Sequence, residues 1–549
     1  MENQAKEAVL LNQLNISAAG SNCQIRLGDI DNDGRLEIIL LQPDIISDER
    51  YFPHAVTAAT AFNLEGDILW QIGTPEPDIP PCKSDLPAQI YDWDNDGSNE
   101  LLCVMNREFC VFDGSTGTIK LKYPLPAPDA HDCIVIANLE GSSYPQNILL
   151  KNKYHEMWAL DKSFNLLWNV KGNLGHMPVP FDLDGDGRDE IIAGYSVFNA
   201  DGKLLWKAEN VEHHPDCIWV SNLAQVKAAA PSVLFGGLET RAYSFSGEHL
   251  WTLAGMHSTN SIQPGNFRAD LKGVEVAGVN TADTDIDEIF LADYHGNTLF
   301  NEKRTTANGR TILSDIYNFD GQNTDLLLAC RGDTHTVMIY DGMMNPVYTF
   351  SAAGYPLSAD LLGDGIPQVL ILDDTQLWIF SAFEIELSSS PLPYGRHQPK
   401  SLYNATVYPC GEIEPWRYAP SYITGNFTTR SVYPWAETCA MCGGEEVELP
   451  ITRADFLVLL VQALGLKGCA QENYFDVKPC EYYFNAAGVA KQNGLFEGVK
   501  LSPLSALTAA DAAEILKRAG FNPIMQKAGE DILSVFDAAK LILQTRPKQ

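Results

Sequence analysis

Positively charged residues are scarce in this chain of 549 residues. Its 38 lysines and arginines are outnumbered by 71 aspartates and glutamates, which gives a formal net charge of −33 at pH 7. A protein of that charge repels the phosphate backbone of nucleic acids, so the composition argues against nucleic-acid binding. Long apolar runs are missing too: no stretch approaches the roughly 18 apolar residues of a membrane span. We therefore expect neither nucleic acid nor membrane as a partner.

Cysteine is also sparse, with 12 in the chain, and most lie in apolar stretches, as Cys103, Cys133 and Cys217 do. This usage is typical of buried, reduced thiols. The first residues, MENQAKEAVLLNQLN, lack the pattern of a secretion signal. Together these features favour a cytoplasmic protein, or a cell-surface or secreted one if a signal was removed. Cys439 and Cys442 form a Cys-x-x-Cys pair that is a hypothetical zinc site.

Long helical patterns are absent from residues 20–390, where short apolar or alternating segments are bounded by Gly, Asp and Asn. This pattern is typical of β-strands. One segment recurs along this region. Its clearest copies are NCQIRLGDIDNDGRLEIILL (22–41), PAQIYDWDNDGSNELLCV (87–104) and GHMPVPFDLDGDGRDEIIAG (175–194), with weaker copies near residues 131, 214, 257, 310 and 355.

A second signature follows most copies: a polar turn, then leucine and tryptophan. It ends at Trp70, Trp168, Trp206 and Trp251. Successive copies of the first segment start 39 to 65 residues apart, which is the length of about four short strands, or one β-propeller blade. The sequence thus predicts an all-β propeller over residues 1–390. Eight copies favour eight blades and leave seven open, if one copy is an insertion or the first and last merge.

The composition changes after residue 390. Residues 391–448 are predicted to form an extended strap or linker, and residues 449–549 a small α-helical C-terminal domain. ITRADFLVLLVQALGL, which begins at Ile451, places apolar residues at helical spacing. Together with LSPLSALTAADAAEILKRAGF, it resembles a surface-layer homology module over about residues 450–521. The resemblance implies a module of the kind that binds cell-wall polymers.

Three copies of the repeat carry a complete D-x-D-x-D-G-x-x-E loop. Their carboxylates are Asp29, Asp31, Asp33 and Glu37; Asp92, Asp94, Asp96 and Glu100; and Asp182, Asp184, Asp186 and Glu190. Oxygen ligands at alternate positions suit Ca²⁺. An EF-hand would need glutamate at position twelve and a helix after it, and neither is present. The loops resemble those of integrin-type (FG-GAP) propeller blades, which implies structural calcium sites; the alternative is an acidic hairpin without an ion.

The loops between first and second strands lie on one face of a propeller, because strand direction alternates within a blade. Residues that precede first strands or follow second strands lie on the other face. That second set is rich in residues that bind or transfer protons. It includes His131, His176, His214 and His257 before first strands, and Lys153, Tyr154, His155, Tyr195, Arg241, Tyr243 and Arg331 at second-strand ends.

First strands line the axis of a propeller, so these side chains are expected to converge on one funnel mouth. Histidine, tyrosine, lysine and arginine together suit an anionic substrate. They also supply what is needed to remove a proton next to a carboxylate: a base with a pKa near neutrality, a cation and a phenol acid. The sequence therefore points to chemistry on the face opposite the acidic loops.

The chain resembles propeller-fold polysaccharide lyases of the calcium-loop type: rhamnogalacturonan, ulvan and rhamnose–glucuronate lyases. The resemblance covers about residues 20–410 and rests on DLDGDGRDE, the repeated DGxxLW, QPGNFRAD and HQPKSLYNATVY. It implies β-elimination at a uronic acid, with rhamnose as the neighbouring sugar. By blade register it implies catalytic roles for His131, His155 and Tyr195, with Arg241 holding the carboxylate. His176 competes as the base and Tyr154 as the acid.

The leading hypothesis is thus a lyase that acts on an acidic polysaccharide or oligosaccharide. The substrate-binding residues predicted with it are Lys153, Tyr154, His214, Tyr243, His257 and Arg331. Two alternatives stay open at this point. One is a non-catalytic carbohydrate- or protein-binding propeller, and the other is an enzyme that uses the histidine funnel to bind zinc or another transition metal.

Overall fold

The computed structural model describes residues 5–387 apart from short loop segments, two strands between 406 and 416, and most of residues 451–541. The chain divides into two compact units. One holds the repeat region, and the other holds the C-terminal helices. The predicted strap, residues 391–448, lies outside the described residues except for the antiparallel pair β34 (Thr406–Pro409) and β35 (Ile413–Trp416). Cys439 and Cys442 also lie outside them.

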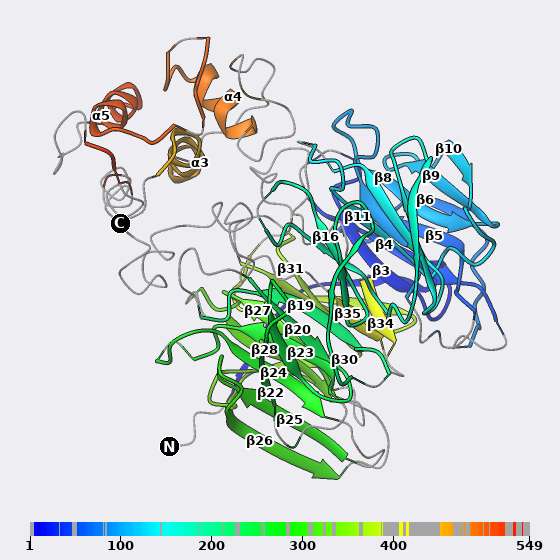
Figure 1. Cartoon of the computed structure of the whole chain (residues 1–549). Helices are drawn as coiled ribbons and strands as arrows, with labels where there is room; N and C mark the ends of the chain where they lie inside the picture. Colours follow the sequence, from blue (N-terminus) through cyan, green and yellow to red (C-terminus); the bar gives the residue numbers. More distant parts are fainter. Residues whose placement is uncertain are drawn as a thin grey trace. The chain divides into compact units, whose positions relative to one another are not determined.

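The repeat region is an eight-bladed β-propeller, the blade count that the sequence favours, and four strands of each blade form an antiparallel sheet (Figure 1). Blade 1 contains β3 (Gln24–Gly28), β4 (Glu37–Pro43), β5 (Val56–Phe62) and β6 (Ile68–Gly73). Blade 2 contains β7 (Ala88–Tyr91), β8 (Glu100–Met105), β9 (Glu108–Asp113) and β10 (Ile119–Pro124). Blade 3 contains β11 (Cys133–Ala137), β12 (Asn147–Lys151), β13 (Glu156–Leu160) and β14 (Leu166–Lys171). Blade 4 contains β15 (Val179–Phe181), β16 (Glu190–Ala193), β17 (Ser196–Phe198) and β18 (Leu204–Lys207). Blade 5 contains β19 (Cys217–Ser221), β20 (Ser232–Gly236), β21 (Arg241–Ser244) and β22 (His249–Thr252). Blade 6 contains β23 (Thr259–Gly265), β24 (Glu275–Asn280), β25 (Ile286–Ala292) and β26 (Thr298–Thr305).

The N-terminal residues close the ring. Blade 7 is β27 (Ile312–Tyr317), β28 (Asp325–Arg331), β29 (Thr336–Tyr340) and β30 (Pro346–Ala353), with the short β1 (Lys6–Glu7) added parallel to β30. Blade 8 takes β31 (Tyr355–Ala359), β32 (Gln368–Leu372) and β33 (Gln376–Ser381) from the end of the repeat region, and its fourth strand is β2 (Val9–Asn15). The start and the end of the repeat region therefore share one sheet, which removes an open edge.

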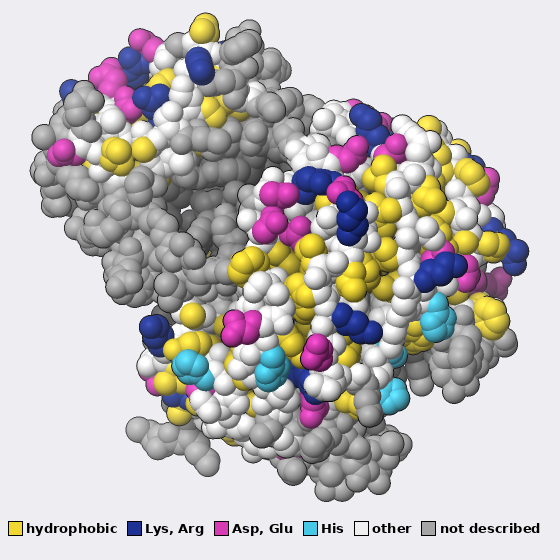
Figure 2. All heavy atoms as spheres, viewed as in Figure 1, with side chains coloured by type: hydrophobic (Ala, Val, Ile, Leu, Met, Phe, Trp, Pro, Cys, Tyr) yellow, Lys and Arg dark blue, Asp and Glu magenta, His cyan; other side chains and the backbone are white. Residues whose placement is uncertain are grey.

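Burial falls from the first strand of a blade to the fourth. Every residue of β11 is buried, whereas β14 alternates between exposed and half-buried residues. The fourth strands expose apolar side chains: Ile68, Ile119, Leu121, Leu166, Leu167, Leu204, Leu205, Leu250 and Leu299. Figure 2 shows apolar side chains gathered across the visible surface of the propeller.

The repeated tryptophan fastens four of the blades to the blade that follows each of them. The Trp168 indole donates from Nε1 to the carbonyl oxygen of Ala200 at 2.8 Å. Trp70, Trp206 and Trp251 make the same bond to Gly114, Phe245 and Tyr294. The ring also covers a turn glycine of the next blade: Gly202 has a φ of +76°, and a Cβ there would lie 2.7 Å from the Trp168 ring. The Leu-Trp signature is thus an inter-blade contact.

The second unit contains three described helices: α3 (Arg453–Ala463), α4 (Phe484–Gln492) and α5 (Ala509–Arg518). Thr508 caps α5 by accepting from the backbone N–H of Asp511 at 3.1 Å. The Arg453 guanidinium lies 2.8 Å from the Asp511 carboxylate, and Phe456, Leu460 and other apolar side chains form the core. Among the described residues, no helix has both the length and the apolar character needed to span a membrane.

Candidate functional site

The strand pairing separates the acidic loops from the predicted site residues. In blade 3, Cys133 at the start of the first strand pairs with Lys151 at the end of the second, while Ala137 pairs with Asn147 at the opposite end. The other blades repeat this register. Residues just before first strands therefore lie on the same face as residues just after second strands. The loops between first and second strands lie on the other face.

Two of the predicted histidines meet on that face. His176 precedes β15 and His214 precedes β19, so they come from adjacent blades, and their Nε2 atoms lie 3.1 Å apart. The carboxylate oxygen Oδ1 of Asp216 lies 3.7 Å from Nε2 of His176 and 4.0 Å from Nε2 of His214. Asp216 was not predicted as a site residue. It joins the cluster because it lies only two residues after His214, in the segment that leads into β19.

Tyr154 holds the two imidazoles in place. Its ring stacks on His214, with centroids 4.8 Å apart and planes inclined by 22°. It meets His176 edge-on, with centroids 5.2 Å apart and planes inclined by 89°. Tyr154 belongs to the turn after β12 and therefore to blade 3. Three neighbouring blades thus contribute to one cluster of side chains.

A buried group of charges lies beside this cluster. The Asp132 carboxylate accepts from Lys151 Nζ at 2.7 Å and lies 3.0 Å from Lys153 Nζ. Lys151 is completely buried, and its ammonium lies 5.9 Å from the centre of the Tyr154 ring. Two ammonium groups share one carboxylate, so this group carries a net positive charge in a strongly acidic protein. Asp132 and Lys151 were not predicted as site residues. Lys151 ends a mostly apolar strand, where a lysine usually faces solvent.

The imidazoles of the cluster are neutral at neutral pH. Burial, followed by the charge of Lys151, lowers the pKa of His214 to about 4. Burial, followed by His214 and Lys151, lowers the pKa of His176 well below its usual value. The same lysine also lowers the pKa of Asp132: burial alone would raise the pKa of that carboxyl, but Lys151 and Lys153 lower it to about 2. Neutral imidazoles can accept a proton or bind a metal.

His131 lies next to this charged group in the chain. Burial lowers the pKa of His131, and the nearby charge of Asp132 partly offsets that effect. Its Nδ1 atom is buried and has no hydrogen-bond partner among the residues that the structure describes. His131 is therefore a neutral imidazole with an unused ring nitrogen.

His155 and Tyr195, the other residues with implied catalytic roles, do not join the cluster. His155 is exposed, and its ring centroid is 6.3 Å from that of Tyr154. Tyr195 is buried among apolar side chains and contacts Phe235 edge-on. Burial, followed by the charge of Asp216, raises the pKa of Tyr195 far above its usual value.

The two predicted arginines are both engaged with other residues. Arg241 is the first residue of β21, a third strand, and not the end of a second strand as predicted. Its guanidinium donates to Glu239 at 2.9 Å from Nε and to the Tyr243 hydroxyl at 3.4 Å. Arg331 ends β28, is buried, and contacts Thr311 and Tyr340. His257 lies outside the described residues.

The acidic loops on the opposite face share one backbone contact. The residue that opens each second strand accepts from a backbone N–H within the loop: Glu37 from Ile30, Glu100 from Trp93 and Glu190 from Leu183. Asn147 and Gln368 make the same bond in blades whose loops lack the complete set of aspartates. One glutamate oxygen is thus structural, and a neutral amide can replace it.

The remaining carboxylate oxygens of the complete loops are crowded enough to hold a cation. Three sets have ligand oxygens within 4.8 Å of one another: Asp29, Asp31 and Asp33; Asp92, Asp94 and Asp96; and Asp182, Asp184 and Glu190. Burial and the neighbouring aspartates raise the pKa of Glu37 to about 9, although the hydrogen bond from the backbone N–H of Ile30 lowers it. Such crowding of oxygen ligands fits Ca²⁺.

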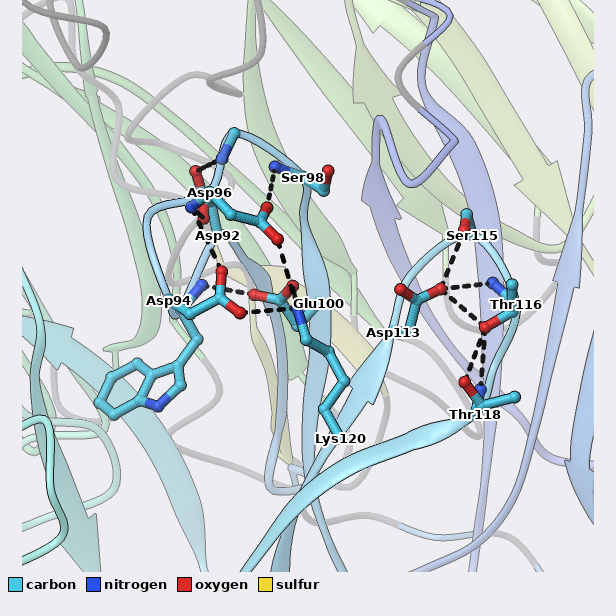
Figure 3. A network of polar contacts seen from close by, with 12 residues as sticks. Asp92, Asp94, Asp96, Ser98, Glu100, Asp113, Ser115, Thr116, Thr118 and Lys120 are labelled. Atoms are coloured by element: carbon cyan, nitrogen blue, oxygen red, sulfur yellow. Dashed lines mark hydrogen bonds and ion pairs between the residues drawn. The ribbon is translucent and has the colours of Figure 1, made fainter.

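The blade 2 loop contains its own cation (Figure 3). Lys120 extends from β10 into the loop, and its ammonium lies 2.7 Å from Asp94 Oδ2, 3.5 Å from Asp96 Oδ2 and 2.8 Å from Glu100 Oε1. In this loop the ammonium occupies the position that a metal ion would need. Local spacing does not indicate this contact, because Lys120 lies 20 residues after Glu100.

Comparison with known proteins supports the fold class. No model of a known protein family matches the chain. Over 95 residues it is 34% identical to the surface-layer 125 kDa protein of Lysinibacillus sphaericus, a match that covers 17% of this chain and only 8% of that protein.

The chain shares its propeller fold with solved rhamnogalacturonan lyases. Exotype rhamnogalacturonan lyase YesX matches with a TM-score of 0.55 and 18% identity, over 77% of this chain and 82% of that one. Rhamnogalacturonan lyase YesW matches with a TM-score of 0.54 and 19% identity, over 75% of this chain and 81% of that one. The Bacillus licheniformis rhamnogalacturonan lyase PL11 matches with a TM-score of 0.52 and 19% identity, over 76% of this chain and 82% of that one. At these identities the likeness is one of fold.

Proposed function

We propose that the protein is a polysaccharide or oligosaccharide lyase that cleaves a glycosidic bond at a uronic acid, with rhamnose as the neighbouring sugar. One observation carries the proposal: the His176–His214–Tyr154 cluster lies beside the Asp132–Lys151–Lys153 group. The first offers neutral imidazoles and a phenol, and the second a net positive charge. An acidic sugar needs both at the same place.

The reaction is a β-elimination. A neutral imidazole, His131 or His176, takes the proton from C5 of the uronate. The electrons of that C–H bond form the C4–C5 double bond, and the C4–O4 bond breaks. The Tyr154 hydroxyl gives a proton to the departing O4, so a new sugar hydroxyl and an unsaturated uronate result. The field of the lysine group stabilises the negative charge that develops on the carboxylate as the proton leaves.

The likeness of fold to rhamnogalacturonan lyases supports this choice of substrate class. The protein's negative charge would repel an acidic glycan almost everywhere, and the lysine group supplies a local attraction. We also propose that the acidic loops of blades 1 and 4 bind Ca²⁺ as structural ions, that the Lys120 ammonium takes the place of the ion in the loop of blade 2, and that calcium takes no part in the chemistry. Their position on the other face of the blades supports that separation.

The test is incubation of the protein with rhamnogalacturonan and other rhamnose–uronate glycans, followed by the ultraviolet absorbance of the unsaturated product. We expect absorbance to rise with wild-type protein and to be lost in Lys153→Met and Tyr154→Phe. Folded protein that gives no unsaturated product on any such glycan would overturn the proposal. Glycan binding without turnover would instead identify a carbohydrate-binding propeller.

A further inference from the structure

Three potential metal ligands converge on one point of the candidate site. The two Nε2 atoms of His176 and His214 and the Oδ1 atom of Asp216 lie 3.1, 3.7 and 4.0 Å from one another. Each residue contributes one ligand atom, and all three atoms lie within 4.8 Å. The side chains are partly accessible, with exposed fractions of 14%, 27% and 22%.

These separations, from 3.1 to 4.0 Å, lie on either side of those around a tetrahedral metal ion. Metal–ligand bonds of about 2.0–2.2 Å at tetrahedral angles place neighbouring ligand atoms about 3.3–3.6 Å apart. A hydrogen bond between the imidazoles would account for the 3.1 Å contact alone. It does not explain why the same two nitrogens also face Asp216, since an N–H that donates to the other ring cannot also donate to the carboxylate. A shared cation accounts for all three approaches.

The framework holds the three side chains in this arrangement. His214 is stacked on Tyr154, and the backbone N–H of Asp216 donates to the Gly236 carbonyl oxygen at 2.7 Å. Gly237 lies directly behind them: a Cβ at this position would lie 2.9 Å from the Tyr195 hydroxyl and 3.2 Å from the His214 carbonyl oxygen. A larger residue at Gly237 would therefore collide with Tyr195 and with the backbone of His214, so the close packing behind His214 requires glycine.

We propose that His176, His214 and Asp216 bind a divalent transition-metal ion such as Zn²⁺. Two imidazole nitrogens and one carboxylate oxygen suit Zn²⁺, Co²⁺ or Ni²⁺, whereas Ca²⁺ prefers oxygen ligands alone. Three protein ligands leave a fourth position open, as in catalytic zinc sites. This site is distinct from the acidic loops, which lie on the other face and offer only oxygen.

The metal's role, unlike its binding, rests on the proposed function. The open position would accept a carboxylate oxygen of the uronate, next to the positive charge of Lys151 and Lys153. His176 would then be engaged as a ligand. This leaves His131, with its unused Nδ1, as the imidazole that removes the C5 proton.

Metal binding is tested with untagged full-length protein that is treated with dipicolinate in calcium-containing buffer and then titrated with Co²⁺. We expect one Co²⁺ per chain, visible absorption of a four-coordinate cobalt site, and a higher Tm. His214→Ala and Asp216→Asn should weaken Co²⁺ binding by more than about 100-fold, the upper end of what loss of a supporting residue causes. His295→Ala, an exposed histidine on the opposite face, should bind like wild type.

Circular dichroism confirms that each variant is folded, and Asp216→Asn keeps the shape of the side chain if His214→Ala does not fold. The proposal is overturned if the wild type binds no Co²⁺ after chelation, or if both ligand variants bind it as His295→Ala does. Lyase activity is measured separately. Metal binding without lysis would refute the proposed function alone, and lysis that is unchanged in metal-free protein would refute the metal's role.

Discussion

The Lys151 ammonium lies 2.7 Å from the Asp132 carboxylate, and the lysine side chain is completely buried. The lysine that ends the second strand of blade 3 thus meets the carboxylate that precedes its first strand. The pair lies beside the candidate site, with the Lys151 ammonium 5.9 Å from the centre of the Tyr154 ring, so removing either charge should change both the stability of the protein and its activity.

Replacing Asp132 with asparagine should destabilise the protein by about 3–5 kcal/mol, because it leaves a buried ammonium without its carboxylate. Urea denaturation at pH 7 measures the loss. The double variant with Lys151→Met should lose less than the sum of the two single variants. Additive losses would show that the two charges do not depend on each other.

Wild-type stability should also depend on pH through Asp132. The pKa of Asp132 is about 2 in the folded protein and about 3.9 in an unfolded chain. The stabilisation is therefore present above about pH 4 and is lost as the pH falls through 2, with a total of about 2.6 kcal/mol. Urea denaturation between pH 5 and pH 2 should show a smaller loss in Asp132→Asn than in wild type.

Tyr154→Phe should lower kcat on a cleaved glycan by about 10²- to 10⁴-fold, since it removes the proposed acid and keeps the ring that stacks on His214. KM should change little. Tyr123→Phe, which alters a tyrosine on the outer strand β10, is the matched control. Normal turnover in Tyr154→Phe would assign the acid to another group.

Lys120→Met should make the protein more sensitive to calcium. Without the ammonium, the carboxylates of Asp94, Asp96 and Glu100 lose their internal cation, so calcium-free protein should be less stable by about 1 kcal/mol. The rise in Tm on adding Ca²⁺ should exceed that of wild type. Lys122→Met, which breaks only the exposed pair with Glu108, should respond as wild type does. An equal calcium response in both variants would contradict this role for Lys120.

Gly202→Ala should be more destabilising than Gly255→Ala. Both glycines have a positive φ, +76° and +81°, so each substitution costs about 1–2 kcal/mol in backbone strain. A Cβ at Gly202 also collides with the Trp168 ring, whereas none of the residues that the structure describes has an atom within 4 Å of a Cβ at Gly255. The collision should add about 1–3 kcal/mol. Chemical denaturation of the two variants measures the difference, and equal losses would refute the inter-blade role of Trp168.

Deleting residues 1–15 should prevent stable folding, because it removes β2 and leaves blade 8 with an open edge at β33. It also removes Leu14 from the core of that blade. Deleting residues 1–7 removes only the two exposed residues of β1 and should be tolerated. Size-exclusion chromatography distinguishes soluble monomer from aggregate. A folded, monomeric 1–15 deletion would show that β2 is dispensable.

Much of the fold could be predicted from the sequence, because each blade is formed almost entirely by consecutive residues. Alternating strands, the loops from Asp29 to Glu37 and the tryptophans at 168 and 206 recur at blade length, and local spacing sets each of them. The opposite placement of loops and histidines also followed from strand direction alone. The count of eight needed the pairing of β2 with β33, which joins residues more than 350 positions apart.

The sequence by itself determined the propeller, the face that carries the histidines and the face that carries the acidic loops, because these follow from strand length and alternation. Only the tertiary structure decided which side chains meet. His176 reaches His214 and Asp216 from the next blade, Lys151 turns inward to Asp132, and Tyr195 is buried while His155 faces solvent. Those outcomes depend on the angle between neighbouring blades and on the course of each turn, which no local pattern of residues specifies.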